Sequence, residues 1–290
     1  METTSRTTSR LLASGPGWRV SDVVCTAGPL NPSFEERHDD TCIAVVTHGT
    51  FQYRSAQGIA VLAPGALLLG NAGHCFECGH EHGTGDRCLA FHFAPDHLEA
   101  IVAVVPGVRR TTFNVPCLPP LPLFLPLVAA AETARDEDDA AELEELALRL
   151  AGAVAAVAGE VRVACEPSRR DQRRITRALR RIEADFRERL TLTELARDAA
   201  MSPYHFLRTF RELVGMTPHQ FVLRTRLNRA AVWLRGSRQF ISAVALDAGF
   251  DDLSTFNRRF RRVMGVSPST YRARRRASNS ERFGELLDRQ

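Results

Sequence analysis

The sequence predicts an α+β protein with two domains: an N-terminal antiparallel β-barrel with a helical hairpin, and a C-terminal domain built only of helices. Its 290 residues, 44% hydrophobic and 25% charged, are enough for two globular domains. Residues 1–165 contain 11 arginines and 20 acidic residues, whereas residues 166–290 contain 27 arginines and 14 acidic residues. The formal charge therefore changes from −9 to +13 along the chain, and the basic part favours a polyanionic partner such as nucleic acid.

The N-terminal part has the pattern of an antiparallel sheet. Short apolar runs such as Cys42–Val46, Ile59–Leu62 and Arg87–Phe93 are separated by turn residues at intervals of about ten positions. Strands of this length and spacing predict a sandwich or barrel. Residues 1–17 are rich in serine, threonine and glycine, and we expect them to be flexible.

A helical hairpin is predicted after a proline-rich passage at 116–126. Two helices, over 127–135 and 142–160, are separated by the acidic turn 136–139. The second helix has an apolar stripe at helical spacing, formed by Leu143, Leu146, Leu150 and Val154. Two interpretations remain open: the hairpin packs on the barrel of its own chain, or it packs on its copy in a homodimer.

The basic C-terminal part contains a first pair of short helices. Thr191 and Glu194 have the spacing of a capping box, and Ser202–Pro203 is typical of the start of a second helix. Phe206 and Phe210 share one face of that helix and are expected to point into a core, so the two helices form a helix-turn-helix motif. The side chains left on the outer face are those of Tyr204, Leu207 and Arg208.

The same pattern recurs about fifty positions later. Residues 241–250 repeat the first helix and its turn, and Phe256 and Phe260 repeat the phenylalanine pair of the second helix. Between the two motifs, residues 218–235 predict a helix of roughly 18 residues, about 27 Å long. Two recognition helices held apart in this way can reach successive major grooves of double-stranded DNA, about 34 Å apart. The alternative is a helical bundle that contacts no DNA.

Several short motifs mark this domain: Leu192–Ala196, Met201–Pro203, Phe206–Phe210, Gly215–Pro218, Arg226–Leu227, Gly249–Asp252, Phe256–Phe260, Gly265–Pro268 and Tyr271–Arg272. With these motifs, the segment from about Arg173 to Arg275 resembles the DNA-binding domain of AraC/XylS-type transcriptional regulators. The resemblance implies that eight residues read bases: Tyr204, Leu207, Arg208, Leu253, Ser254, Thr255, Asn257 and Arg258.

The chemistry of these side chains suggests what each would contact. Arg208 and Arg258 suit the O6 and N7 atoms of guanine, and Asn257 suits the N6 and N7 atoms of adenine. Leu207 and Leu253 suit the methyl group of thymine. Three arginines between the two motifs are either phosphate anchors or part of a solvated face, namely Arg224, Arg226 and Arg229.

Cysteine and histidine gather in the N-terminal domain. The stretch from His74 to His92 holds three cysteines and four histidines, which are ligands that zinc and copper prefer. Its candidate metal ligands are Cys75, Cys78, His80, His82, Cys88 and His92. Three interpretations stay open: a site for zinc or another transition metal, a thiol sensor of oxidants or electrophiles, and a purely structural cluster. The four isolated cysteines are expected in the core: Cys25, Cys42, Cys117 and Cys165.

The strand pattern also carries a resemblance. Leu62–Leu69 and the spacing His80-x-His82-x3-Asp86 look like the cupin-type sensor domain that often precedes AraC-type DNA-binding domains. Metal-binding cupins usually carry glutamate where Asp86 stands. The resemblance implies a one-component transcriptional regulator, not an enzyme, whose N-terminal domain responds to an unidentified effector. Two alternatives are a metallocupin enzyme tethered to DNA and a constitutive architectural DNA binder.

The sequence also predicts where the protein works and how it is divided. No apolar run reaches the ~18 residues of a membrane helix, and no secretory signal is recognisable, so we expect a cytoplasmic protein without a membrane partner. The predicted division is a flexible N-terminus (1–17), a cupin-like sensor domain (18–115), a helical hairpin that suits dimerisation (116–165), a linker (166–172), a bipartite helix-turn-helix domain (173–276) and a tail (277–290).

Overall fold

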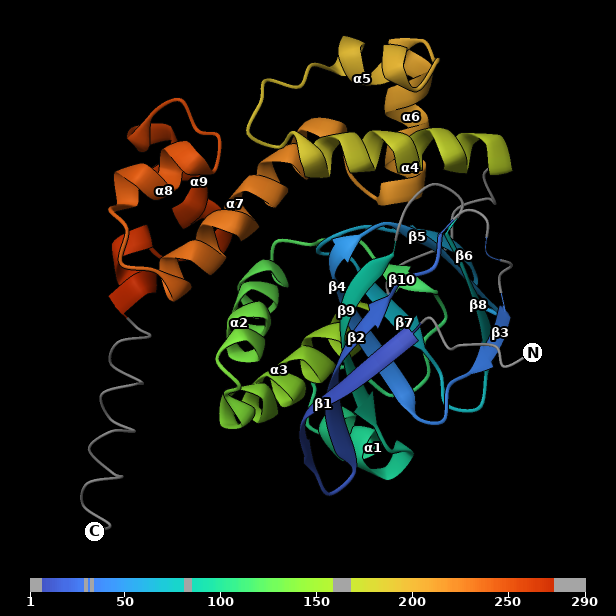
Figure 1. Ribbon diagram of the computed structural model, residues 1–290. Coiled ribbons are helices and arrows are strands. Elements are labelled where there is room, and N and C mark those ends of the chain that lie inside the picture. Colours follow the sequence, from blue (N-terminus) through green and yellow to red (C-terminus); the bar gives the residue numbers. More distant parts are fainter. Residues whose placement is uncertain (1–6, 29–30, 32–33, 81–84, 159–167, 274–290) are drawn as a thin grey trace.

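The computed structural model describes residues 7–28, 31, 34–80, 85–158 and 168–273. It contains a sheet domain followed by a helical domain, as the sequence predicted (Figure 1). The predicted tail 277–290, the candidate ligand His82 and the cysteine Cys165 lie outside the described residues.

A six-stranded antiparallel sheet forms one wall of the N-terminal domain. Its strands follow the order β1-β2-β9-β4-β7-β10, with bounds β1 Thr7–Gly15, β2 Trp18–Cys25, β4 Thr41–Gly49, β7 Leu67–Gly70, β9 Asp86–Phe93 and β10 Cys117–Leu118. The prediction of a flexible N-terminus was wrong for residues 7–15, which form the edge strand β1. Most β1 side chains are exposed, so the strand lacks the apolar pattern that would have predicted it.

A four-stranded antiparallel sheet faces the first. Its order is β3-β8-β5-β6, with bounds β3 Phe34–Arg37, β5 Phe51–Ser55, β6 Gly58–Leu62 and β8 Cys75–Gly79. Within the described residues the strand pairings form two antiparallel sheets, which confirms the predicted antiparallel fold without joining the strands into one closed barrel. Cys42, Ala44 and Val46 of β4 point between the sheets, whereas Ile43 and Val45 point to the opposite face. Strand β4, in the interior of the six-stranded sheet, is therefore buried on both faces.

Three helices pack against the N-terminal domain: α1 Pro95–Ala103, α2 Leu125–Asp136 and α3 Ala140–Ala158. The apolar stripe of α3, including Leu143 and Leu150, joins the same core as Ile43 and Phe91 of the six-stranded sheet. This stripe is therefore used within one chain, as the first of our two interpretations of the hairpin requires. Helix α2 also contacts the C-terminal domain through Leu125 and Ala129.

The C-terminal domain is formed by α4 Arg169–Ala184, α5 Leu192–Asp198, α6 Pro203–Val214, α7 Pro218–Gly236, α8 Ile241–Asp247 and α9 Leu253–Met264. Helix α4 begins inside the segment 166–172 that we predicted as a linker, because the hydroxyl of Ser168 accepts a hydrogen bond from the amide of Asp171 and caps the helix. Figure 1 shows α7 running from the α5–α6 pair to the α8–α9 pair.

Each helix-turn-helix unit has its own core, and the N-terminal domain contributes to both. Phe206 and Phe210 pack in one core together with Val61 and Ala63 at the end of β6. The equivalent phenylalanines of the second unit pack in another core together with Leu125 and Ala129 of α2. The two domains therefore share buried apolar surface at both units. None of the helices in the described residues is both long and apolar enough to span a membrane.

Candidate nucleic-acid interface and buried cavity

Helix α6 exposes the side chains that we predicted to read bases. Ser202 caps the helix through the amide of His205, and Phe206 and Phe210 are fully buried. The helical period then turns Tyr204 and Arg208 outward, with exposed fractions of 78% and 62%. Leu207 is half-buried beside them, and the Arg208 guanidinium lies 3.5 Å from the carboxylate of Glu212 one turn later.

Helix α9 repeats this arrangement. The carboxylate of Asp252 accepts a hydrogen bond of 2.7 Å from the amide of Thr255 and caps the helix. Phe256 and Phe260 are fully buried. The remaining predicted DNA contacts, Leu253, Ser254, Asn257 and Arg258, are exposed, and Thr255 is half-buried.

The two units also end in the same way. Helix α6 is closed by Gly215 at φ 75°, and α9 by Gly265 at φ 77°. Both conformations lie in the left-handed region that favours glycine. The connecting helix α7 has 19 residues, which corresponds to about 28 Å. The sequence repeat is therefore a structural repeat with an intervening rod.

Two of the three arginines predicted as phosphate anchors have other contacts. The Arg226 side chain donates hydrogen bonds to the backbone oxygens of Phe186 (2.6 Å) and Glu188 (2.7 Å), which ties α7 to the segment after α4. Arg224 is half-buried and donates to the sulfur of Met216. Both side chains support the fold of the domain. This role differs from the two that we predicted for these arginines, a phosphate anchor or part of a solvated face.

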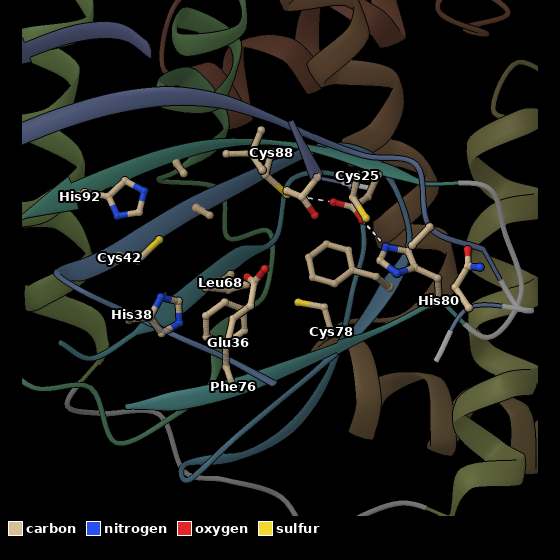
Figure 2. A pocket seen from close by; sticks show the side chains of 18 residues that line it. Cys25, Glu36, His38, Cys42, Leu68, Phe76, Cys78, His80, Cys88 and His92 are labelled. Carbon is tan, nitrogen blue, oxygen red and sulfur yellow. Dashed lines mark hydrogen bonds and ion pairs between the residues drawn. The ribbon is translucent and has the colours of Figure 1, made fainter. Parts of the chain in front are cut away.

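A cavity of about 200 Å³ lies between the two sheets of the N-terminal domain. Apolar side chains from both sheets form much of its wall, including Ala44, Leu68 and Phe76. Its titratable lining is unusually rich in sulfur and imidazole and consists of Cys25, Glu36, His38, Cys42, Cys78, His80, Asp86, Cys88 and His92. Figure 2 shows Cys25 and His80 toward one end of the cavity and His38, Cys42 and His92 toward the other.

At one end, three potential ligands converge. The sulfur of Cys25, an imidazole nitrogen of His80 and a carboxylate oxygen of Asp86 all lie within 4.8 Å of one another. His80 Nε2 contacts the Asp86 carboxylate, and the Cys88 thiol donates to the same carboxylate over 3.6 Å (Figure 2). Phe51 stacks on the His80 ring at 5.9 Å.

These contacts shift two pKa values. Burial disfavours the charged form of His80, but its hydrogen bonds to Asp86 and Cys25 outweigh that effect and raise its pKa to about 9. Burial likewise opposes ionisation of Cys25, but the hydrogen bond with His80 lowers the pKa of this thiol below its ordinary value. Burial instead raises the pKa of the Cys42 thiol to about 12.

Two imidazoles, those of His38 and His92, lie at the other end of the cavity. Burial lowers the pKa values of His38 and His92 to about 4, so both imidazoles are uncharged at neutral pH. His38 Nε2 lies 2.9 Å from the hydroxyl of Tyr53, and its ring stacks on Phe76 at 4.1 Å.

Family models match both domains. Residues 24–151 match the AraC-like ligand binding domain, and residues 195–274 match a helix-turn-helix domain. The transcriptional activator AarP of Providencia stuartii is 34% identical over 91 residues, which cover 31% of this chain and 67% of AarP. The chain belongs to the AraC family of transcriptional regulators. The predicted ligand-binding and DNA-binding domains of this regulator are thereby confirmed.

Other relatives of this AraC-family regulator match over similar lengths. The probable transcriptional regulator LumQ of Photobacterium leiognathi is 36% identical over 90 residues, and the match covers 31% of this chain but only 36% of LumQ. Among solved structures, the DNA-binding domain of AdpA in complex with a target DNA is 32% identical, with a TM-score of 0.35, and the match covers 36% of this chain and 94% of that one.

Only some of the predicted metal ligands of this AraC-family regulator lie close together in the structure. His80 belongs to the three-ligand cluster, and Cys78, Cys88 and His92 line the cavity at other points. Cys75 is exposed and lies outside the cavity, because residues three positions apart in a strand point to opposite faces.

Sequence reasoning missed the other two members of the cluster. Cys25 was expected in the core and Asp86 only as a cupin-like position, yet β2 and β9 pair Cys25 directly with Asp86. No local sequence signal indicates this pairing, because it depends on the register of two strands far apart in the chain.

The turn between β4 and β5 joins the cavity region to the DNA-binding domain. His48 Nδ1 lies 2.8 Å from the carboxylate of Glu183 in α4, and the amide of Gly49 donates to the same carboxylate over 3.1 Å. Arg180 of α4 donates to the backbone oxygen of Thr50. The first helix-turn-helix unit is thus held by the N-terminal domain through polar contacts as well as apolar ones.

The second unit is held by the helical hairpin. The Asn228 side chain of α7 donates a hydrogen bond of 3.0 Å to Glu132 of α2, and Arg235 contacts Glu142 of α3. Glu132 is buried, and burial raises the pKa of this carboxyl. The relative placement of the two units is therefore fixed by the N-terminal domain as well as by α7.

Proposed function

We propose that this regulator reads two adjacent major grooves of double-stranded DNA, one with α6 and one with α9. One observation supports the proposal above all. Helices α6 and α9 each expose one face to solvent, while the opposite face of each helix carries a buried phenylalanine pair. A recognition helix places its N-terminal residues at base edges, and the 19-residue helix α7, about 28 Å long, is close in length to the ~34 Å between successive major grooves.

The proposed division of roles follows from side-chain chemistry. Arg208 and Arg258 bind guanine, Asn257 binds adenine, and Leu207 and Leu253 contact thymine methyl groups. The proposed remaining contacts are made by Tyr204, Ser254 and Thr255, all near the N-terminal ends of their helices.

Selection of binding sites from random duplexes with the full chain tests this function. The proposal predicts a bipartite site whose two specified segments lie about one helical turn apart, roughly 10 base pairs from centre to centre. Selection of a single short segment would show that only one helix reads DNA. Selection of no sequence at all would favour an architectural binder.

We propose that a ligand in the cavity between the sheets controls this binding. The support is position: the turn between β4 and β5 contacts α4, and α2 contacts α7. A ligand that stabilises one arrangement of these contacts shifts the population of the DNA-binding arrangement. The sulfur and imidazole lining favours a transition metal such as zinc, or a thiol-reactive small molecule, as the effector.

We also propose that the regulator has no catalytic role and acts as a homodimer. The named relatives are regulators, which supports the first point. The apolar stripe of α3 is used inside the chain, so the proposed dimer contact is the neighbouring outer surface, where Val104 and Leu148 are exposed. Replacement of Leu148 by glutamate should convert a dimer to a monomer in light-scattering measurements, and an unchanged mass would refute this contact.

A further inference from the structure

Cys25, His80 and Asp86 form a compact set of metal-ligand types at one end of the cavity. Cys25 ends β2 and Asp86 begins β9 in the six-stranded sheet, whereas His80 directly follows β8 in the facing sheet. Their ligand atoms lie within 4.8 Å of one another. Zn²⁺ bonds of about 2.0–2.3 Å separate tetrahedral ligand atoms by about 3.5 Å, so small side-chain adjustments would close the site around an ion.

The backbone around this set is closely packed, which fixes two of the ligands. Gly85 has φ +79°, and a Cβ atom there would lie 2.1 Å from the backbone oxygen of Cys25. Only glycine allows this approach, and it places Asp86 opposite Cys25. The Cys88 thiol donates to the second oxygen of the Asp86 carboxylate, the kind of outer hydrogen bond that orients metal ligands.

We propose that Cys25, His80 and Asp86 bind one divalent transition-metal ion of the zinc class, with a fourth position open to the cavity. A thiolate and an imidazole select such ions over magnesium or calcium. In the bound state one thiolate, one carboxylate and a neutral imidazole carry two negative charges, which a divalent cation neutralises in this buried setting, and the protons held by His80 and Cys25 are released to solvent as the ion binds. Three protein ligands leave a coordination position for water or a small ligand.

Binding of the ion links the two sheets next to the contact with the DNA-binding domain. Asp86 pairs with Gly49 across β9 and β4, and Gly49 donates its amide to Glu183 of α4. Phe51, the first residue of β5, stacks on His80. The ion would therefore stabilise the turn that holds α4. This signalling role rests on the proposed function, whereas the metal site itself does not.

Titration of the full chain with Co²⁺ tests the site, because Co²⁺ replaces zinc and absorbs light when bound to a thiolate. We expect one equivalent to bind with a thiolate charge-transfer band that Zn²⁺ removes. Cys25→Ser should abolish the band and weaken binding by about tenfold or more, and Asp86→Asn should weaken it similarly. Cys75→Ser is the matched control, since Cys75 is exposed and outside the cavity.

Several outcomes would overturn the site. These are the absence of stoichiometric binding, a band that survives in Cys25→Ser, and a band that disappears in Cys75→Ser. Circular dichroism of each variant separates loss of a ligand from loss of the fold. Alkylation by iodoacetamide gives a second readout: Zn²⁺ should protect Cys25, and equal labelling with and without Zn²⁺ would contradict the proposal.

DNA binding separates this inference from the proposed function. We expect zinc-saturated and zinc-free chains to differ in affinity for the selected duplex, and Cys25→Ser to remove the difference. If Zn²⁺ binds at Cys25 but DNA affinity stays the same, the signalling role is refuted and the site is retained. If Arg208→Ala leaves DNA affinity unchanged while Co²⁺ still binds, the proposed DNA contact fails independently of the metal site.

Discussion

The two domains of this regulator place their functional groups in opposite ways. In the DNA-binding domain, the candidate contacts lie on single helices, close together in sequence and turned toward solvent, as with Tyr204 and Arg208. In the N-terminal domain, the candidate ligands come from separate strands and point inward, as with Cys25 and Asp86. A groove-reading surface depends on local helical geometry, whereas an interior site depends on long-range strand register.

The largest expected effect concerns the core behind the exposed helix face. Phe256 is fully buried between Phe250 and Phe260, with ring centroids 5.1 and 5.4 Å away. Phe256→Ala should lower the free energy of unfolding by about 3–5 kcal/mol, measured by urea denaturation. Leu253→Ala, an exposed position in the same helix, should cost less than about 1 kcal/mol. Equal costs would contradict the assignment of inner and outer faces.

Acid should destabilise the N-terminal domain through His38 and His92. Their folded pKa values of about 4 lie below the ordinary 6.5, so the unfolded chain binds more protons between these values. The stability from the neutral imidazoles is complete above pH 6.5 and is lost as pH falls toward 4, on the order of 3 kcal/mol per histidine at most. Melting temperatures between pH 4 and 7 should fall less steeply in His92→Gln than in the parent chain.

His80 should have the opposite pH dependence. Its folded pKa of about 9 lies above 6.5, so its contribution is complete below pH 6.5 and is lost as pH rises through 9. His80→Gln should flatten the melting-temperature profile between pH 7 and 9, and an unchanged profile there would contradict the buried contact with Asp86. The two ends of one cavity are thereby distinguished by the sign of their pH response.

Arginine substitutions should separate base reading from phosphate binding. Arg208→Ala and Arg258→Ala should each cost about 1–3 kcal/mol of binding free energy and relax the preference at one base pair. Arg261, exposed near the end of α9, is the control, and its replacement by alanine should weaken binding to all sequences and reduce the salt slope by about 1. A uniform loss for Arg208→Ala would assign that residue to a phosphate.

The smallest expected effect concerns the contact between the domains. Glu183→Gln should weaken the interaction with His48 and the amide of Gly49, at a stability cost below about 1 kcal/mol because the His48 side chain is 69% exposed. Hydrogen exchange should increase in α4 and in the turn between β4 and β5. Glu144→Gln, an exposed change in α3, should leave exchange in both segments unchanged.

The helical domain was largely predictable from sequence, and particular residues explain why. The pairs Phe206–Phe210 and Phe256–Phe260 mark an inner face at helical spacing, and Ser202 marks a helix start. These signals act within a few positions, so they define the helix, its buried face and its exposed face together. The side chain of Arg226 was harder to predict, because its backbone partners lie about forty positions earlier.

The strand-rich character of the N-terminal domain was predictable from the sequence, but the residues that cluster in its cavity were not. Cys88 and His92 are four positions apart in β9 and therefore share one face of the strand, and both line the cavity. The position of Cys25 next to Asp86 depends on strand pairing, and the exclusion of Cys75 depends on which face of β8 points inward. The many cysteines and histidines in this stretch of sequence therefore indicated the region of the candidate site, but they did not indicate which side chains form the three-ligand cluster.

A series of duplexes that differ only in spacing tests whether one chain reads two successive grooves with α6 and α9. Affinity of the full chain should be measured on duplexes that carry the two selected segments one helical turn apart, and on duplexes with about five additional base pairs between them. We expect a large loss of affinity at the longer spacing, which rotates the second segment to the opposite side of the duplex, and a smaller spacing-dependent loss in Arg258→Ala, which binds more weakly at the original spacing because it gains less from the second segment. Equal affinity of the parent chain at both spacings would contradict the reading of two grooves by one chain.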